Sequence, residues 1–298
     1  MNKTKLFEEK GLNLWTKRYW NLIQRNIGFI TFEEQEKLRN TKIAVFGVGG
    51  LGGPLAEQLV RAGCENIAIC DNEKFEESNL NRQICTREDI GEYKVDVVKD
   101  FLKKINPDIV INSYYNCIKN NILKILNNVE IVALTLDDPI TSILISRECC
   151  KKKIPILESW AFPYICAWWF TEATIDYETF YGFNTHNMSI QQIRESESVL
   201  LNIKEALLAK ILQFPYLKEI CNREPGALEG MISGNIALRS FPPMVRMTAS
   251  YLSFEIIFTG ILKIKKMILV PHMIGYDYFR MKPLEFNFLD GNKNSIDN

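Results

Sequence analysis

The sequence is poor in the features that mark several protein classes. It has only two histidines among 298 residues, His186 and His272, and none of its eight cysteines forms a C-x-x-C pair. Zinc sites are usually built from such pairs, so we expect no structural zinc. The formal net charge is zero, with 36 basic and 36 acidic residues. This balance argues against a nucleic-acid partner, which usually requires a basic excess.

No segment has the apolar length of a membrane-targeting signal. The amino terminus, MNKTKLFEEKGLNLW, is polar and lacks the apolar core of a signal peptide. The longest apolar stretch near the end, residues 251–264, is too short for a bilayer span and contains Glu255 and Lys263. We therefore expect a reduced cytoplasmic protein with no membrane partner.

A nucleotide-binding pattern occupies residues 43–71. An apolar run at 43–46 is followed by the turn GVGGLGG, a helical segment at 54–62, and a second apolar run at 66–70 that ends in Asp71. Glycine allows the backbone to approach a phosphate closely, and a helix N-terminus attracts anions. A carboxylate at the end of the second strand can accept hydrogen bonds from ribose hydroxyls. The alternative is a purely structural turn. The candidate phosphate-binding residues are Gly47, Gly49, Gly50 and Gly52.

A polar cluster follows Asp71 at a spacing that suits a triphosphate. An amide and a guanidinium, Asn79 and Arg82, lie three residues apart beside Gln83, and Lys94 comes twelve residues after Arg82. Arg and Lys bind phosphates and can stabilise a leaving pyrophosphate, whereas an ordinary dehydrogenase needs no such cluster. Taken singly, each residue favours the alternative of a solvated charged loop with a capping Asn.

The segments GVGGLGG, DNEKFEESNLNRQ and GEYK together resemble the adenylyltransferases of the ThiF/MoeB superfamily, which includes the ubiquitin-activating enzymes. The resemblance runs from about Arg18 to Phe170 and resumes from Ser240 to Gly260. It implies that ATP and magnesium convert a carboxylate into an acyl-adenylate. It also implies a homodimer in which an arginine reaches the partner's ATP. Arg18 and Arg25 are the candidates for that arginine, because Trp20 and Asn21 occupy the expected position.

Asp137 follows an apolar strand at 130–135, which places its carboxylate at the ligand-binding edge of a parallel sheet. The resemblance makes Asp137 the magnesium ligand. The alternative, a cap for the helix that begins near Ile140, is a role that Asp138 can fill. The catalytic candidates are Arg82, Lys94 and Asp137.

Alternating strand and helix patterns predict an α/β fold with a doubly wound, mostly parallel sheet. We expect a helical arm at 1–40, with residues 1–17 mobile or loosely docked and one helical stretch at 18–39. An ATP-binding core at 41–172 and a crossover or insert region at 173–239 follow. The last part, 240–298, completes the same domain. The other expected helices are 94–105, 122–127, 140–152 and 196–212, and the other expected strands are 109–113, 154–158 and 165–171.

Two regions carry further expectations. In relatives the crossover region covers the active site, and its one cysteine here, Cys221, is an acyl or sulfur acceptor only if exposed with a lowered pKa.

The helix at 244–260 is apolar nearly all round, so we expect it to be buried beneath the nucleotide and at the dimer interface. We expect one or two strands in 265–298 before a disordered tail, GNKNSIDN. The aromatics of 159–171 favour the core, although some would line the acceptor groove.

The acceptor is the open question. Asp71-Asn72, the run through Asn79 to Gln83 and Asp137-x-Pro139 look most like the branch that adenylates ribosomal peptides for microcin-C-type antibiotics. The chain departs from that branch in lacking a long N-terminal peptide-clamping domain and zinc cysteines. The alternatives are activation of a sulfur-carrier protein's C-terminal glycine, as in thiamine or molybdopterin synthesis, and a non-catalytic nucleotide-binding subunit. A tRNA-modifying enzyme is disfavoured by the neutral charge.

Overall fold

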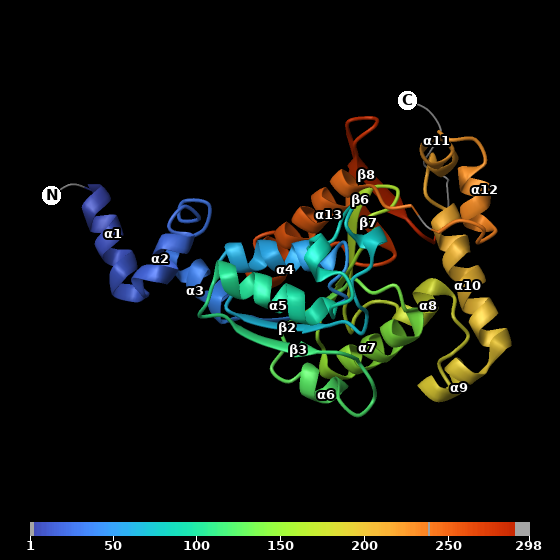
Figure 1. The fold of residues 1–298 in the computed structure, drawn as a ribbon, viewed down its shortest axis with the longest axis horizontal. Helices are drawn as coiled ribbons and strands as arrows, with labels where there is room; N and C mark the ends of the chain where they lie inside the picture. The colour runs from blue at the N-terminus through green and yellow to red at the C-terminus, as the bar shows by residue number, and fades with distance from the viewer. Residues whose placement is uncertain (1–2, 238, 290–298) are drawn as a thin grey trace.

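The computed structural model describes residues 3–237 and 239–289, and it is organised around one twisted sheet (Figure 1). The eight strands lie in the order β3-β2-β1-β4-β5-β6-β7-β8. The first five are parallel and the last three antiparallel. The strands are β1 Lys42–Phe46, β2 Asn66–Cys70, β3 Val110–Tyr114, β4 Ile131–Leu134, β5 Ile156–Glu158, β6 Ile165–Phe170, β7 His272–Asp277 and β8 Lys282–Asn287.

Helices cover both faces of this sheet, which confirms the predicted doubly wound class. One face packs against α4, α5 and α13, and the other against α6 and α7 (Figure 1). The central strands are almost entirely apolar because they are buried on both sides, as in parallel sheets generally. These helices are α4 Gly52–Arg61, α5 Lys94–Ile105, α6 Ile122–Ile125, α7 Pro139–Lys152 and α13 Pro242–Phe254.

The amino-terminal region is helical, as the sequence predicted, but it is divided into separate helices. Residues 3–40 form three helices, α1 Lys3–Leu14, α2 Lys17–Ile23 and α3 Phe32–Asn40, at one end of the molecule (Figure 1). Gly11 lets α1 lie directly on the ring of Trp20, and the expected mobility or loose docking of residues 1–17 stays a prediction. The single helical stretch was wrong, because the chain turns between α2 and α3 at Gly28, whose φ is +118°.

The crossover region is a group of short helices beside the sheet (Figure 1). The expected helix at 196–212 is present as α10 Glu197–Leu212. Arg147 of α7 fastens the region by donating to both carboxylate oxygens of Glu178 and to the backbone carbonyl of Met188. The other helices are α8 Tyr177–Tyr181, α9 Ile190–Glu195, α11 Leu217–Cys221 and α12 Ala227–Ile232.

The late helix is buried on one face within the chain, and its predicted burial at a dimer interface stays a prediction. α13 continues into a π-helical segment, η3 Glu255–Ile261. Val245 and Leu252 face the core, whereas Met247 and Phe254 are 45% and 60% exposed. The two strands expected after it are present as β7 and β8, and the tail GNKNSIDN lies outside the described residues. Within the described ranges, no helix is long and apolar enough to cross a bilayer.

Candidate active site

The carboxyl ends of four neighbouring parallel strands open into one cavity. β2, β1, β4 and β5 are adjacent in the sheet, and residues that follow each of them line a space of about 570 Å³. This is the edge where open α/β sheets bind ligands. The predicted site residues that line the cavity are Gly47, Gly49, Gly50, Asp71, Asn79, Arg82, Gln83, Lys94 and Asp137.

The glycine turn after β1 follows a path that a larger residue cannot take. Gly47 has a φ of +87°, and a Cβ there would lie 2.5 Å from the carbonyl oxygen of Thr135. Gly52 does not line the cavity; its Cβ would lie 1.8 Å from the carbonyl oxygen of Gly47, so it allows close packing within the turn. The Thr135 hydroxyl donates to that same oxygen at 2.7 Å. The turn is therefore fixed between β1 and β4.

Asp71 is buried and held in one orientation at the end of β2. Its Oδ2 accepts the backbone N–H of Val48 at 2.8 Å, and its Oδ1 accepts that of Glu73 at 2.9 Å. Burial raises the pKa of Asp71, although these N–H groups and the charge of Lys94 oppose the shift. The remaining lone pairs of the carboxylate are available to a ribose hydroxyl.

Two cations enter the cavity with their positions already set. Lys94 begins α5 with its side chain 5% exposed, and its Nζ lies 2.5 Å from Oε2 of Glu73. The Nη1 of Arg82 donates to the backbone carbonyl of Ser78 at 3.1 Å and to Oδ1 of Asn81 at 2.9 Å. Lys94 is thus paired with a carboxylate, whereas Arg82 has only neutral oxygen partners, which a phosphate can replace.

The two aspartates after β4 have different surroundings. Asp138 caps α7, with its Oδ1 accepting the N–H of Ile140 at 3.0 Å. Asp137 has no hydrogen-bond partner among the described residues. Desolvation by the surrounding protein and the negative charge of Glu73 raise the pKa of Asp137. The positive charges of Lys94 and Arg82 oppose this shift. Asp137 thus faces the cavity as a carboxylate that would gain from a bound cation.

The two amides of the cluster differ in how far they are satisfied. The Oδ1 of Asn79 accepts the backbone N–H of Glu76 at 3.2 Å, so its carbonyl side shapes the loop. Gln83 is 6% exposed, and its Oε1 has no hydrogen-bond partner. An unpaired buried amide oxygen is costly, which marks Gln83 as a group that awaits a ligand in this cavity.

Several lining residues were not predicted from the sequence. Thr135 contacts the glycine turn, and Glu73 contacts Lys94. Both contacts arise from the fold, so the sequence alone does not predict them. Ser240 and Val245 come from the segment before and within α13, where the family resemblance resumes. Of the aromatics at 159–171, Trp168, Trp169 and Phe170 are core residues, whereas Trp160 lines the cavity.

Three predicted residues lie away from the cavity. Arg18 forms an exposed ion pair of 2.8 Å with Asp108, which lies just before β3 at the opposite edge of the sheet. Arg25 is exposed and has no ionic partner among the described residues. Cys221 is half-buried, and burial raises its pKa to about 11. These are the opposite of the conditions that an acceptor thiolate requires.

A second group of potential metal ligands lies in the crossover region. Asp176, Glu178 and His186 bring their ligand atoms within 4.8 Å of one another. Glu178, however, is already bound by Arg147 and by the hydroxyl of Thr185, and Asp176 caps α8. These contacts account for the cluster as part of the protein scaffold.

Comparison with known proteins gives two kinds of match. The ThiF family profile matches residues 23–295. The adenylyltransferase and sulfurtransferase UBA4 of Candida albicans is 35% identical over 123 residues, which cover 41% of this chain and 28% of the relative. The sulfur carrier protein adenylyltransferase of Thermus thermophilus is 32% identical over 136 residues, covering 44% and 50%. The chain thus spans at most half the length of these two relatives.

Solved structures match over more of the chain at lower identity. E. coli MccB with ATP superposes with a TM-score of 0.59 at 21% identity, covering 86% of this chain and 66% of MccB. The microcin C7 biosynthetic enzyme MccB in complex with N-formylated MccA gives 0.58 at 21% identity, covering 88% and 68%. At such identity the likeness shows a shared fold.

Proposed function

Because the chain belongs to the ThiF family, we propose that it is an adenylyltransferase that uses ATP to activate a carboxylate. One observation carries the proposal: a glycine turn, the oriented carboxylate of Asp71, two cations and the unpaired Asp137 meet in one cavity. Each feature alone has a structural explanation. Their convergence at the strand ends matches the needs of a nucleoside triphosphate.

The chemistry needs positioning and charge stabilisation rather than a protein nucleophile. The glycine turn would hold the phosphates, and Asp71 would accept a ribose hydroxyl. A carboxylate oxygen of the substrate attacks the α-phosphorus while the bond to the bridging oxygen breaks, and pyrophosphate leaves with that electron pair. Lys94 and Arg82 would leave their present partners and stabilise the charge that develops on the pyrophosphate.

Magnesium fits the residues around Asp137. The carboxylate lacks a partner among the described residues, and desolvation and the negative charge of Glu73 raise its pKa, so a cation there would offset the repulsion between the two carboxylates. Magnesium prefers oxygen ligands and commonly uses one or two carboxylates together with substrate phosphates. When bound, it would neutralise phosphate charge, and Asp137 would hold it on the acceptor side of the glycine turn.

We propose that the acceptor is the C-terminal carboxylate of a ribosomally made peptide in natural-product biosynthesis. The fold match to MccB, which was solved with N-formylated MccA, supports this choice. The alternative is the C-terminal glycine of a ubiquitin-like sulfur-carrier protein, supported by the T. thermophilus relative. A non-catalytic subunit is disfavoured because Arg82, Lys94 and Asp137 all reach the cavity.

We also propose a homodimer formed through the outward face of α13. Met247 and Phe254 are exposed there, and the ring of Phe258 stacks on that of Phe254 at 5.7 Å. Exposed apolar side chains that recur about every two turns on one helix face favour association. A homodimer would also allow an arginine of one subunit to reach the ATP of the other.

Acceptor-dependent ATP–pyrophosphate exchange by the purified chain tests the proposed activity. The acceptors are synthetic peptides encoded by short reading frames beside its gene, and the host's sulfur-carrier proteins. Exchange with a peptide supports the first acceptor class, and exchange only with a carrier protein favours the alternative. ATP binding without exchange for either class favours the non-catalytic subunit.

A further inference from the structure

Lys94, which the proposed function assigns to the phosphates, already has a carboxylate partner within the chain. Its Nζ lies 2.5 Å from Oε2 of Glu73, and its side chain is only 5% exposed. A buried ammonium needs such a counter-ion, because taking an unpaired charge out of water is costly. The proposed function requires the same ammonium to stabilise the pyrophosphate. Phosphates must therefore compete with Glu73 for Lys94.

The backbone of Glu73 is fixed, whereas its side chain is free to move. Its N–H donates to Oδ1 of Asp71 at 2.9 Å, and its carbonyl oxygen accepts the N–H of Lys94 at 3.0 Å. The side chain is 63% exposed, and among the described residues its carboxylate has no hydrogen bond or ion pair except the one with Lys94. Rotation of the side chain alone can therefore take this carboxylate away from Lys94.

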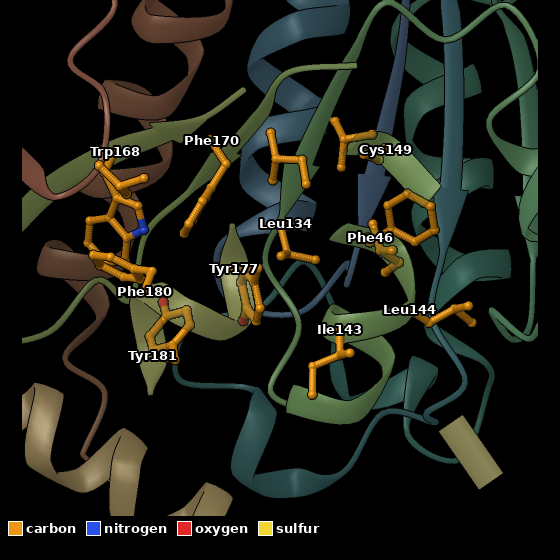
Figure 2. Packing of buried hydrophobic residues seen from close by; sticks show 14 of the residues in the cluster. Phe46, Leu134, Ile143, Leu144, Cys149, Trp168, Phe170, Tyr177, Phe180 and Tyr181 are labelled. Atoms are coloured by element: carbon orange, nitrogen blue, oxygen red, sulfur yellow. The ribbon is translucent and has the colours of Figure 1, made fainter. Parts of the chain in front are cut away.

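The neighbouring strand ends are rigid by comparison. Phe46 ends β1 and Leu134 ends β4, and both side chains lie in the packed core that Figure 2 shows. The glycine turn begins directly after Phe46, and Asp137 comes three residues after Leu134. Packed interiors resist displacement. Adjustment to a ligand is therefore easier for the Glu73 side chain than for the strand ends.

Glu73 also acts electrostatically on Asp137. Glu73 follows β2 and Asp137 follows β4, and β1 with its glycine turn lies between these strands. Desolvation and then the negative charge of Glu73 raise the pKa of Asp137, whereas the charge of Lys94 opposes the shift. Phosphates that take Lys94 remove this compensation, so the two carboxylates repel each other and the phosphates more strongly. A divalent cation held by Asp137 would offset that repulsion.

We propose that Glu73 couples cation binding to nucleotide binding. It is the counter-ion of Lys94 that phosphates displace, and its charge is then compensated by the cation held at Asp137. This inference rests on the proposed adenylation, and it adds a link between the metal and Lys94. Without the cation, displacement leaves the carboxylates of Glu73 and Asp137 uncompensated beside the phosphates. Glu73 acts through Lys94 and is thus a positioning residue.

Calorimetric titration of ATP into the full chain, in magnesium and in a chelator, tests this coupling. E73Q keeps an oxygen acceptor for Lys94 but removes the competing charge. In chelator it should bind ATP roughly tenfold more tightly than wild type, because like charges at close range are costly. In saturating magnesium the two proteins should bind ATP about equally. The tightening of ATP binding by magnesium should therefore be roughly tenfold smaller in E73Q.

E73D gives a second variant that keeps the charge and shortens the side chain by one methylene. Its carboxylate reaches Lys94 less well, so its ATP affinity in chelator should lie between those of wild type and E73Q. Thermal melts verify that both variants are folded. If E73Q does not fold, E73D decides: an affinity in chelator equal to that of wild type overturns the proposal.

The matched control is E76Q. Glu76 lines the same cavity, and among the described residues it has no ion pair. The substitution removes the same charge from the cavity without touching Lys94, so its magnesium dependence should follow wild type. An equal gain in E76Q and E73Q would show a general effect of cavity charge and overturn the proposal. It is also overturned if E73Q binds ATP in chelator no more tightly than wild type.

Failure of the proposed function gives a different result. If wild type binds no ATP in either condition, the nucleotide site itself is wrong, and the coupling fails with it. If wild type binds ATP and E73Q has the same magnesium dependence, only the coupling is wrong. A lower melting temperature of E73Q with unchanged magnesium dependence would assign Glu73 to stability alone.

Discussion

Asp137 and Asp138 are consecutive residues after β4, yet their surroundings differ. Asp138 is bound within the protein, whereas Asp137 is available to a ligand. The Oδ1 of Asp138 caps α7, and the guanidinium of Arg194 lies 3.2 Å from its Oδ2. The hydroxyl of Thr141, which also donates to Oδ2, lowers the pKa of Asp138 together with these contacts. Asp137 has a raised pKa and no partner among the described residues. The pair therefore allows a ligand-binding carboxylate to be compared with a structural one.

We predict that D137A lowers ATP–pyrophosphate exchange by about 100-fold or more, because it removes charge stabilisation at the reacting phosphates. Its free energy of unfolding should stay close to wild type, since no hydrogen bond is lost. D138A should keep exchange within a few-fold while losing about 1 kcal/mol of stability with its cap. Exchange assays and urea unfolding of both variants measure this. Wild-type exchange activity in D137A would contradict a role of Asp137 as a metal ligand.

Glu158 links stability to pH. Burial raises the pKa of Glu158 to about 7, against an ordinary value of 4.5. Between these values the folded state holds a proton that the unfolded state has released, so this group's contribution to stability falls as pH rises. We predict that the unfolding free energy of wild type relative to E158Q decreases, on the order of 3 kcal/mol, between pH 4.5 and 7.5.

Urea unfolding of both proteins across that pH range provides the measurement. Groups with lowered pKa values, such as Asp138 and Glu178, give the opposite trend. They are present in both proteins and cancel in the difference. A difference that is flat with pH would show that Glu158 is ionised as readily in the folded state as in the unfolded one.

In the glycine turn, we expect Gly47 to be required for stability and Gly49 for ATP binding. A Cβ on Gly47 would meet the Thr135 carbonyl at 2.5 Å with φ at +87°, whereas a Cβ on Gly49 would meet only Gln83, at 3.6 Å. We predict that G47A lowers the melting temperature by several degrees, equivalent to roughly 2 kcal/mol. G49A should keep the wild-type melting temperature but weaken ATP binding, because its methyl group enters the cavity where phosphates approach. Thermal melts and ATP titrations distinguish the two, and an equal melting temperature for both variants would contradict this assignment.

Secondary structure could be predicted wherever burial alone decides it. The strands β1, β2 and β4 are apolar runs, and α5 has a regular apolar face, so the local sequence alone predicts these elements. The packing of α1 could not be foreseen, because it depends on contacts of Phe7 with Trp20 and Phe32. For the late helix α13, composition shows that the segment is apolar on most sides but does not show which side packs within the chain and which faces outward.

For the whole molecule, the sequence predicted the part of the cavity around the glycine turn better than the part that follows β5. The glycine turn, Asp71 and Asp137 each follow a strand in a familiar pattern, and the structure brings them into one cavity. Trp160 carries no such pattern. Its place depends on β5 lying next to β4, and on rings supplied by β6 and α8. Such long-range neighbours are set by topology rather than by local sequence.

Assembly offers the last prediction, because a homodimer would let subunits share residues. Arg18 already pairs with Asp108 at the far edge of the sheet, whereas Arg25 is exposed and unpaired among the described residues. Arg25 lies before α3, whose Leu38 shares a buried cluster with Ile261 of η3, next to the proposed interface. We therefore expect Arg25 to complete the neighbouring subunit's ATP site.

R25A and D137A homodimers should each lose most exchange activity. In a mixed dimer, the D137A subunit would supply Arg25 to the intact Asp137 cavity of its R25A partner. Mixing the two after mild dissociation should therefore restore exchange to about a quarter of wild type, since random pairing makes half the dimers mixed with one intact site each. R18A mixed with D137A should give no comparable gain, because R18A alone should retain activity. If R25A alone is fully active, or if light scattering shows a monomer, the active site is complete within one chain.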